Sequence, residues 1–401
     1  MLAMARLRRR TYNLLKNINK PCSLILGVDS VTGLSLVRDL GIQKIPTICI
    51  DENRFAISRF SKYCSSIEYH NSEEDLILKM EEIGRISPYR NIIFCESDRY
   101  LLFLDKNREI LKEYFHFPYP TKLTLTELMN KKNQARFSKE LGIGTPTAFY
   151  SDEVSLPEIK ERINYPVFIK SFYSQRQYRR KGEVVGNWEE LVRVARQERF
   201  LRGAYMIQEI IEGPEDNIWL AVGYCDRKGR FLALATAYKI RQIPKDFGVG
   251  TVVRSKENKI IAEQAKSLVE HIGYRGCFAI EFKKCPDKEE YKFIEFNPRT
   301  CMFNELITLC GFNLPYLVYC DFVGLPYDCD GVKQKEGLLW HSIIDDFIAM
   351  AKYYSKSNKT VFFEWVRTML KADIYADFSI LDIGPFMAKI LQLVLRTSRN
   401  R

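Results

Sequence analysis

The chain has 401 residues, of which 46% are hydrophobic and 28% charged, so it is long enough for about two or three soluble domains. Its formal net charge of +11 is confined to the two ends: residues 1–20 carry six Lys or Arg and no acid, and residues 351–401 carry nine against four acids. Residues 21–350 therefore sum to zero, which argues against a nucleic-acid-binding face on the main fold.

The cysteine and histidine pattern argues against the common metal and redox sites. Eleven cysteines occur without any CxxC pair, and only four histidines are present. An odd number of thiols inside apolar segments predicts reduced, core-packed cysteines in a cytosolic protein. The basic N-terminus lacks the apolar core of a signal peptide, and no run approaches the ~20 apolar residues that cross a bilayer.

A basic leader, 1–20, precedes a segment that predicts a small parallel α/β domain over 21–115. A buried strand at 22–28, a short helix carrying Leu34, Leu36, Val37 and Leu40, and a strand at 45–51 form one strand-helix-strand unit. A helix at 72–84 and a strand at 91–97 continue it. The intervening turn, GVDSVTG at 27–33, does not match the GxGxxG fingerprint, so it predicts a tight turn rather than a dinucleotide site.

A second region, 116–330, mixes helices and strands. The stretch 124–142 predicts a helix with Thr124 or Thr126 as N-cap and Gly142 at its end. Strands are expected at 165–173, which contains Lys170 in an apolar run, and at 205–211. A helix at 257–272 leads to strands at 276–284 and 291–297, and a mostly helical tail begins at 331.

The last two strands of this region carry the chemistry. Glu281 and Glu295 flank a charged turn, and in a hairpin centred on residue 288 they lie opposite each other on one face. Facing carboxylates on apolar strands repel unless a cation lies between them. Asn297 adds an amide oxygen on the same face, so the three residues predict half of a Mg²⁺ shell, and Arg299 can meet phosphoryl charge. The alternative is a solvated edge strand.

These residues resemble the E…E-x-N-x-R metal signature of the ATP-grasp superfamily of carboxylate-amine ligases. The resemblance spans nearly all of 21–330 and implies a Rossmann-like pre-ATP-grasp domain at 21–115, an ATP-grasp fold with lobes at 116–205 and 206–330, and a helical, basic C-terminal extension at 331–401. The opening stretch LILGVDSVTGLSLVRDLG and the later stretch SRFSKYCSS resemble a subgroup of this superfamily, the predicted ATP-dependent carboligases.

The resemblance also implies roles for single residues, with ATP and Mg²⁺ (or Mn²⁺) as the cofactors. It implies that Lys131, or its neighbour Lys132, and Lys170 contact phosphate, that the backbone of Gln208–Ile211 holds adenine, and that Glu215 grips ribose hydroxyls. Lys239 and Arg241 occupy positions at which such ligases contact phosphate or the substrate carboxylate. The implied catalytic residues are Arg241 and Arg299, the metal ligands are Glu281, Glu295 and Asn297, and the nucleotide-binding residues are Lys131, Lys170, Lys181, Glu209, Ile211 and Glu215.

Many members of the family have a Gly/Ser-rich loop, the lid, that covers the triphosphate. In this chain the lid is a basic segment with Arg176, Arg179, Arg180 and Lys181. Charged side chains would then bind phosphate in place of backbone N–H groups. A solvated loop is the alternative.

The tail from 331 has apolar residues at helical spacing with basic neighbours, which predicts either helices packed on the lobe or a basic amphipathic contact with the anionic inner membrane surface.

The resemblance implies a cytoplasmic ligase that joins a carboxylate to an amine through an acyl phosphate and releases ADP and phosphate. The basic lid and tail suggest an acidic substrate, such as a cell-envelope or saccharide-linked precursor. The alternatives are an ATP-binding module without catalysis and a peripheral membrane protein acting through its basic tail. The oligomeric state and the identities of the acid and the amine do not follow from the sequence.

Overall fold

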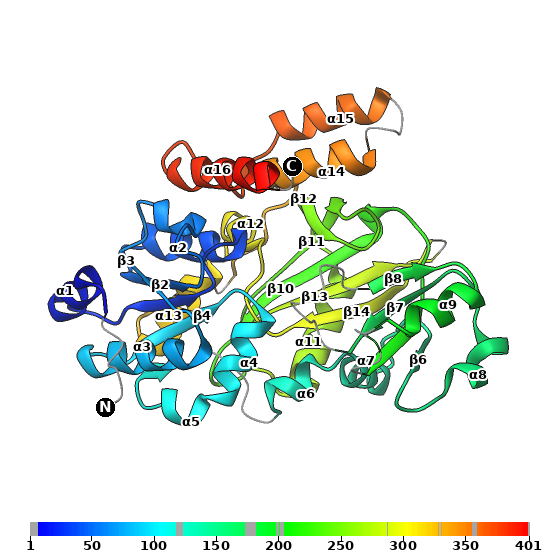
Figure 1. The fold of residues 1–401 in the computed structure, drawn as a ribbon, viewed down its shortest axis with the longest axis horizontal. Coiled ribbons are helices and arrows are strands. Elements are labelled where there is room, and N and C mark those ends of the chain that lie inside the picture. The colour runs from blue at the N-terminus through cyan, green and yellow to red at the C-terminus, as the bar shows by residue number, and fades with distance from the viewer. Residues whose placement is uncertain are drawn as a thin grey trace.

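The computed structural model describes residues 7–117, 123–172, 182–197, 200, 204–286, 288–327, 329, 331–354 and 359–399. The described part of the chain contains three β-sheets (Figure 1). The predicted α/β architecture, with a parallel N-terminal sheet and a helical C-terminal region, is confirmed. Among the described residues, every helix is too short or too polar to cross a bilayer.

The N-terminal sheet is parallel, with the strand order β3-β2-β1-β4-β5. Its buried strands are continuous apolar runs because helices cover both faces. The strands are β1 (Ser23–Leu26), β2 (Thr47–Asp51), β3 (Ser66–Tyr69), β4 (Asn91–Cys95) and β5 (Phe115–His116); the helices are α1 (Arg9–Asn17), α2 (Val31–Ile42), α3 (Glu73–Ile86), α4 (Asp98–Lys106) and α5 (Arg108–Leu111), with a 3₁₀ turn η1 (Ile57–Phe60).

The middle lobe is a four-stranded antiparallel sheet in the order β6-β9-β7-β8. It contains β6 (Ala148–Tyr150), β7 (Val167–Ser171), β8 (Gly182–Val185), β9 (Tyr205–Glu209), α8 (Leu156–Ile159), η2 (Lys160–Arg162) and α9 (Trp188–Ala195). The predicted single helix at 124–142 is two helices, α6 (Leu125–Met129) and α7 (Lys131–Glu140). Thr124 caps α6 in a capping box, and extended Asn130 ends α6 and caps α7.

The third sheet has seven strands in the order β14-β13-β10-β11-β12-β15-β16. Its elements are η3 (Glu215–Asn217), β10 (Ile218–Cys225), β11 (Phe231–Ile243), β12 (Val249–Ser255), α11 (Lys259–Ile272), β13 (Gly276–Lys284), β14 (Tyr291–Asn297), α12 (Asn304–Leu309) and α13 (Leu314–Val323). Buried residues of this sheet, α12 and α13 share one apolar cluster with residues of β1, β2 and α2, so the core is continuous between the N-terminal domain and this lobe.

The C-terminal extension is not helical throughout, because it adds two strands to the seven-stranded sheet: β15 (Leu339–His341) and β16 (Ile374–Tyr375). Its helices form a separate layer above α2 and β12 (Figure 1). They are α14 (Ile343–Ala349), a π-helical turn (Met350–Tyr354), α15 (Lys359–Leu370) and α16 (Gly384–Arg399).

All eleven cysteines lie outside disulfides, and nine of them are buried, in agreement with the predicted core-packed thiols.

Candidate active site

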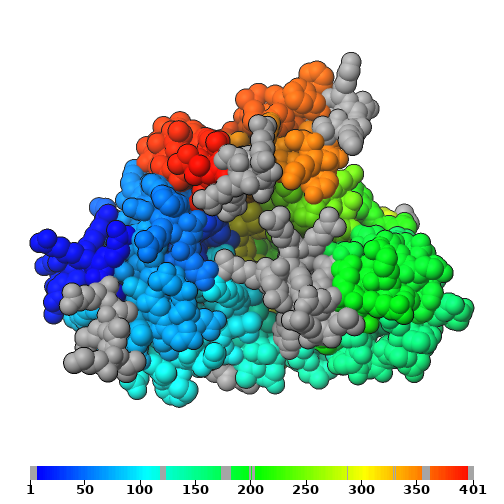
Figure 2. Space-filling model, viewed as in Figure 1, coloured from blue at the N-terminus to red at the C-terminus, as the bar shows by residue number. Residues whose placement is uncertain are grey.

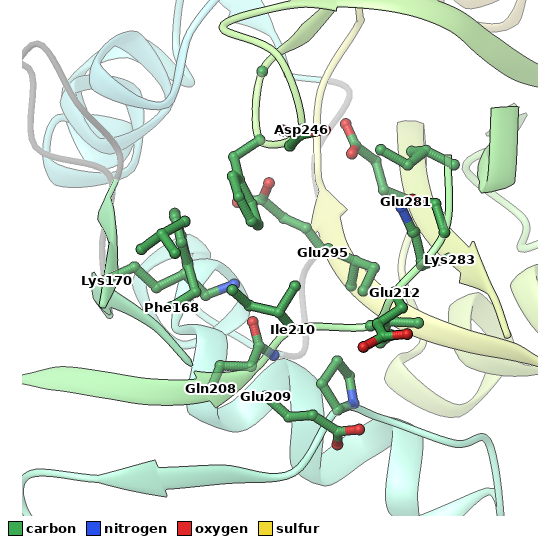
Figure 3. A pocket seen from close by; sticks show the side chains of 18 of the residues that line it. Phe168, Lys170, Gln208, Glu209, Ile210, Glu212, Asp246, Glu281, Lys283 and Glu295 are labelled. Atoms are coloured by element: carbon green, nitrogen blue, oxygen red, sulfur yellow. Dashed lines mark hydrogen bonds between the residues drawn. The ribbon is translucent and has the colours of Figure 1, made fainter. Parts of the chain in front are cut away.

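The β13–β14 hairpin places two carboxylates side by side. Glu281 pairs directly with Glu295 in the antiparallel register, so their side chains share one face of the sheet, as predicted for a hairpin centred on residue 288. Asn297 pairs with Ala279, two residues farther along the same ladder. Both glutamates line a cavity of about 410 Å³ that is walled by the four-stranded and the seven-stranded sheets (Figure 3).

Each of these carboxylates has a lysine within ion-pair distance. Lys239 Nζ, on β11, lies 3.0 Å from Glu281 Oε2, and Lys131 Nζ, at the start of α7, lies 3.3 Å from Glu295 Oε1. The Lys239 side chain is 2% exposed, and its ammonium also donates to the carbonyl of Gly248. The two lysines offset the negative charge of the two carboxylates, and they place positive charge on the wall of the cavity.

The donor set of the hairpin fits a divalent cation such as Mg²⁺. The carboxylates of Glu281 and Glu295 and the amide oxygen of Asn297 are the hard oxygen donors that this ion prefers. Within the described part of the chain, no three His, Cys, Asp or Glu side chains are close enough to hold a metal. Phosphate oxygens of a nucleotide and water would therefore have to complete the coordination shell.

The alternative lysines Lys131 and Lys132 point in different directions. Lys131 lines the cavity, whereas the ammonium of Lys132 lies 2.7 and 2.8 Å from the carboxylates of Asp152 and Glu153. The break at Asn130 makes Lys131 the first residue of α7 and so directs it inward. Lys170 on β7 enters the same cavity from the wall opposite the hairpin (Figure 3).

The segment that follows β9 forms one edge of the cavity. The strand ends at Glu209, and residues 210–213 leave the sheet and line the cavity, with Ile211 among them. Backbone groups outside a strand ladder are available to a ligand. The Glu209 side chain itself accepts a hydrogen bond from the Thr147 N–H at 2.9 Å. It also lies 3.6 Å from the Lys292 ammonium, so it links the end of β9 to β14.

Glu215, predicted to hold ribose, is not among the residues that line the cavity. Its carboxylate accepts hydrogen bonds from the Tyr354 hydroxyl and, at 3.3 Å, from the Asp246 N–H. Burial raises the pKa of Glu215. The C-terminal extension, through Tyr354, therefore contacts an acid that the sequence assigned to the nucleotide.

Arg241, predicted to be catalytic, does not line the cavity. A β-bulge follows Lys239: Lys239 pairs with Val253, but Arg241 pairs with Val252. The extra residue directs Arg241 to the face opposite Lys239. There its guanidinium donates to both carboxylate oxygens of Asp346, on α14, at 3.0 and 2.8 Å.

Asp346 is the centre of a buried polar cluster. It also accepts from the Thr251 hydroxyl and hydrogen-bonds with His341, both at distances of 2.7–2.8 Å. Although burial opposes ionisation, hydrogen bonds from His341 and Arg241 lower the pKa of Asp346 to about 2. The described contacts of Arg241 attach the extension to β11, and its catalytic role stays a prediction.

A second, larger cavity of about 1070 Å³ lies at the carboxyl ends of β1, β2 and β4. Asp51 and Glu96 line it from the N-terminal domain, and Glu295, Asn297 and Arg299 line it from the hairpin. Because Glu295 borders both cavities, the two spaces meet at the end of β14. Ligands commonly bind α/β sheets at this edge of the strands.

Arg299 is held at this junction. Its Nε donates to Asp98 at 2.7 Å, and its Nη2 donates to the amide oxygen of Asn297 at 3.3 Å. Burial opposes the charge, but Asp98 and Glu96 raise the pKa of Arg299. A permanent cation therefore lines the second cavity beside Asn297.

The lining of the second cavity does not match the predicted acidic substrate. Among the described residues it contains more acids than bases: Asp29, Asp51, Glu52, Glu73, Glu96, Asp98 and Glu295 against Arg99, Lys106 and Arg299. The tail that motivated the expectation lies in a different layer and supplies none of these side chains. The basic lid, with Arg176, Arg179, Arg180 and Lys181, lies outside the described residues.

Sequence reasoning missed three residues that line the first cavity. Phe168 on β7 stacks on Phe247 from the loop after β11, with ring centroids 4.6 Å apart, so the two lobes touch across the cavity. Lys283 donates to the carbonyls of Gly213 and Pro214, and burial lowers its pKa. Lys283 had a sequence signal, since it lies two residues after Glu281, whereas Phe247 lies in an irregular loop and had none.

Comparisons with known proteins agree with this geometry. Residues 226–308 match the model of the carbamoyl-phosphate synthase L chain, ATP binding domain, and this stretch contains the whole hairpin. A D-aspartate ligase of Enterococcus faecium is 25% identical over 246 residues, which are 58% of this chain and 58% of that protein. The match thus spans little more than half of that relative's length.

Solved structures extend the similarity to most of the fold. Biotin carboxylase of Campylobacter jejuni superimposes with a TM-score of 0.62 at 16% identity, over 80% of this chain and 75% of that one. N5-carboxyaminoimidazole synthetase of Staphylococcus aureus, complexed with ADP, gives 0.60 at 12% identity, over 78% and 80%. The chain therefore shares the fold of these solved structures, and its residues 226–308 match the model of an ATP-binding domain. Both findings agree with the resemblance to ATP-grasp proteins seen in the sequence.

Proposed function

We propose that the protein is an ATP-dependent ligase that joins a carboxylate to an amine or a similar nucleophile. One observation carries the proposal: Glu281 and Glu295 face one cavity, with Lys131, Lys170 and Lys239 on its walls, and Glu295 also borders the second cavity. A nucleotide in the first cavity would therefore present its terminal phosphate toward the second. The similarity to a D-aspartate ligase supports a carboxylate as the group activated.

The reaction follows from this arrangement. A carboxylate oxygen of the substrate attacks the γ-phosphorus of ATP, ADP leaves, and an acyl phosphate forms. The amine nitrogen then attacks the acyl carbon, loses a proton, and inorganic phosphate leaves. The protein contributes position and charge: the three lysines hold phosphate oxygens, and Arg299 stabilises the charge that develops at the junction.

Mg²⁺ (or Mn²⁺), bound by Glu281, Glu295 and Asn297, would supply further neutralisation of phosphate charge. The nucleotide base would lie along residues 209–212, against Phe168. The buried free thiols are consistent with the cytoplasm, which is the location we propose.

The test is ADP release by the full chain with Mg-ATP and a panel of carboxylic acids, each combined with a panel of amines. We expect one acid to stimulate release and one amine to increase it further, with formation of a condensed product. Lys131→Gln should abolish the stimulation, whereas Lys132→Gln, altered at the neighbouring residue that faces away, should retain it. Binding of Mg-ATP without turnover for any pair would instead support the non-catalytic ATP-binding module.

A further inference from the structure

Helix α16 is apolar on the face that it turns outward. Its inner side packs on the protein, with Ala388 in a small core cluster and the Lys389 ammonium 3.0 and 3.2 Å from the carboxylates of Asp345 and Asp377. Among the side chains of α16 that the structure describes, the exposed ones are Met387, Ile390, Leu391, Leu393, Val394 and Leu395, and Val394 is 57% exposed. A surface helix normally turns charged residues outward, and a helix that is apolar on both sides is normally covered.

The loop before α16 continues this apolar surface. Ile380 and Leu381 are 82% and 71% exposed, and Ile383 is exposed as well. The loop is held firmly, because the buried Asp382 carboxylate between them accepts from Arg38 Nε at 3.0 Å and from the Lys62 N–H at 2.8 Å. The apolar side chains are therefore displayed by an anchored loop.

The N-terminal domain adds two aromatic residues to the same surface. Phe55, 64% exposed, and Phe60 flank α16: the Gln392 amide donates to the Phe55 carbonyl at 2.8 Å, and Gly384 packs against the Phe60 carbonyl so closely that a side chain there would collide with it. We call this surface the apolar patch; it consists of Phe55, Phe60, Ile380, Leu381, Ile383, Met387, Leu391 and Val394. Figure 2 shows α16, in red, at the surface beside the N-terminal domain.

Basic residues predominate around the apolar patch. Arg54, Arg59 and Lys62 are exposed beside Phe55 and Phe60, and over 54–62 and 378–395 the only acid is the buried Asp382. The neighbouring acids Glu52, Asp29 and Asp345 contact Arg99, Gln392 and Lys389. A second copy of the chain would bring the same positive charges together across a two-fold axis. An anionic bilayer attracts basic residues and accepts scattered apolar side chains without a complementary shape.

We propose that the apolar patch docks the protein on an anionic lipid bilayer, with Phe55, Phe60 and the outer face of α16 in the interface and Arg54, Arg59 and Lys62 against the headgroups. This surface combines segments from both ends of the chain, so it exists only in the folded protein. It does not depend on the proposed ligase activity.

The test is flotation of the full chain with vesicles of phosphatidylcholine alone or with about one third phosphatidylglycerol. We expect flotation with the anionic vesicles and its loss as salt is raised. The double variant Leu391→Glu with Val394→Glu should reduce the bound fraction at least about tenfold, because it places charge in the interface at positions where the folded protein is exposed to water. An unchanged thermal transition shows that the variant is folded.

A matched pair of variants separates the specific surface from general charge attraction. Arg54→Gln with Arg59→Gln and Lys62→Gln should release the protein from vesicles at lower salt. Lys139→Gln with Arg193→Gln and Lys266→Gln, which removes three charges from α7, α9 and α11, should behave as the parent.

Three results would overturn the proposal: a parent chain that does not float, a double variant that floats as the parent does, or equal effects of the two charge variants. A dimer that Leu391→Glu with Val394→Glu dissociates, in a chain that ignores vesicles, would show that the patch binds a second copy instead.

Discussion

The β13–β14 hairpin and strand β11 both carry charged residues at alternate positions, but only the hairpin keeps its charges on one face. Glu281 and Glu295 lie opposite each other and line the cavity. On β11, Lys239 lines the same cavity while Arg241 binds Asp346 of the extension, because a bulge separates the two residues. An extra residue thus divides one strand between lining the cavity and attaching the C-terminal layer.

This difference shows what a register contributes to function. In the hairpin, two like charges share a face at a cost that lysines or a cation must offset. In β11, the arginine is compensated completely by the protein's own Asp346, so no ligand is needed there. Substitutions in the two regions should therefore have opposite signatures: loss of activity in a stable protein, and loss of stability in an active one.

The largest effect is expected at the hairpin. Glu295→Gln should lower kcat for ADP release at least about 10³-fold, corresponding to about 4 kcal/mol, because it removes a charge that we propose holds the metal and nucleotide. The thermal transition should change little, since Glu295 is partly exposed and its Lys131 partner lies at the cavity. Steady-state kinetics beside calorimetry checks this, and a variant with parental kcat would remove the hairpin from the mechanism.

The opposite signature is expected on β11. Arg241→Met should lower the free energy of unfolding by about 3 kcal/mol, because it leaves Asp346 buried without its guanidinium. The folded fraction should keep its affinity for ATP. Chemical denaturation measures the stability, and Arg241→Met with Asp346→Leu serves as the control that restores part of it. Parental stability with lost turnover would return Arg241 to the catalytic role that the sequence suggested.

The buried acid Glu305 should make the free energy of unfolding depend on pH. Burial raises the pKa of Glu305, on α12, to about 7, despite Arg38 at 3.5 Å. Because the folded pKa is above that of an unfolded glutamate, stability should be full below the unfolded pKa of about 4.3 and fall until the pH passes about 7.

Glu305→Gln, which cannot ionise, should remove this fall and be more stable than the parent at pH 8 by about 2 kcal/mol, with no gain near pH 4. Denaturation across this pH range tests it. An unaltered pH profile in the variant would show that another group titrates.

The smallest effect is expected at Tyr354. Tyr354→Phe removes the hydrogen bond to Glu215, which should cost about 1.5 kcal/mol of stability and leave the Kd for ATP unchanged within about twofold. Titration calorimetry and denaturation together check this. If ATP binds more than about tenfold more weakly, Glu215 positions the nucleotide as its sequence motif implies.

The hairpin could be predicted because its signal is local. The spacing of Glu281, Glu295 and Asn297 fixes which side chains share a face once the strands pair, and the apolar runs of β1, β2 and β4 identify a buried parallel sheet in the same way. The capping of α6 by Thr124 also follows from nearby residues.

The remaining features depend on contacts distant in sequence. The bulge before Arg241 becomes meaningful only because Asp346, more than a hundred residues later, lies against it. Asn130 splits the predicted helix, and Lys131, not Lys132, then lines the cavity. The strands β15 and β16 are short and acquire their partners only from the completed sheet, so the tail was predicted as mainly helical.

The central claim is that Glu281 and Glu295 together bind the divalent cation that anchors a nucleotide in the first cavity. Titration calorimetry of Mg-ATP into the parent chain, Glu295→Gln and the control Lys132→Gln tests it most directly. We expect saturable heat for the parent and the control that disappears when EDTA removes Mg²⁺, and at least about tenfold weaker binding by Glu295→Gln. Equal, metal-independent affinity in all three proteins would contradict it.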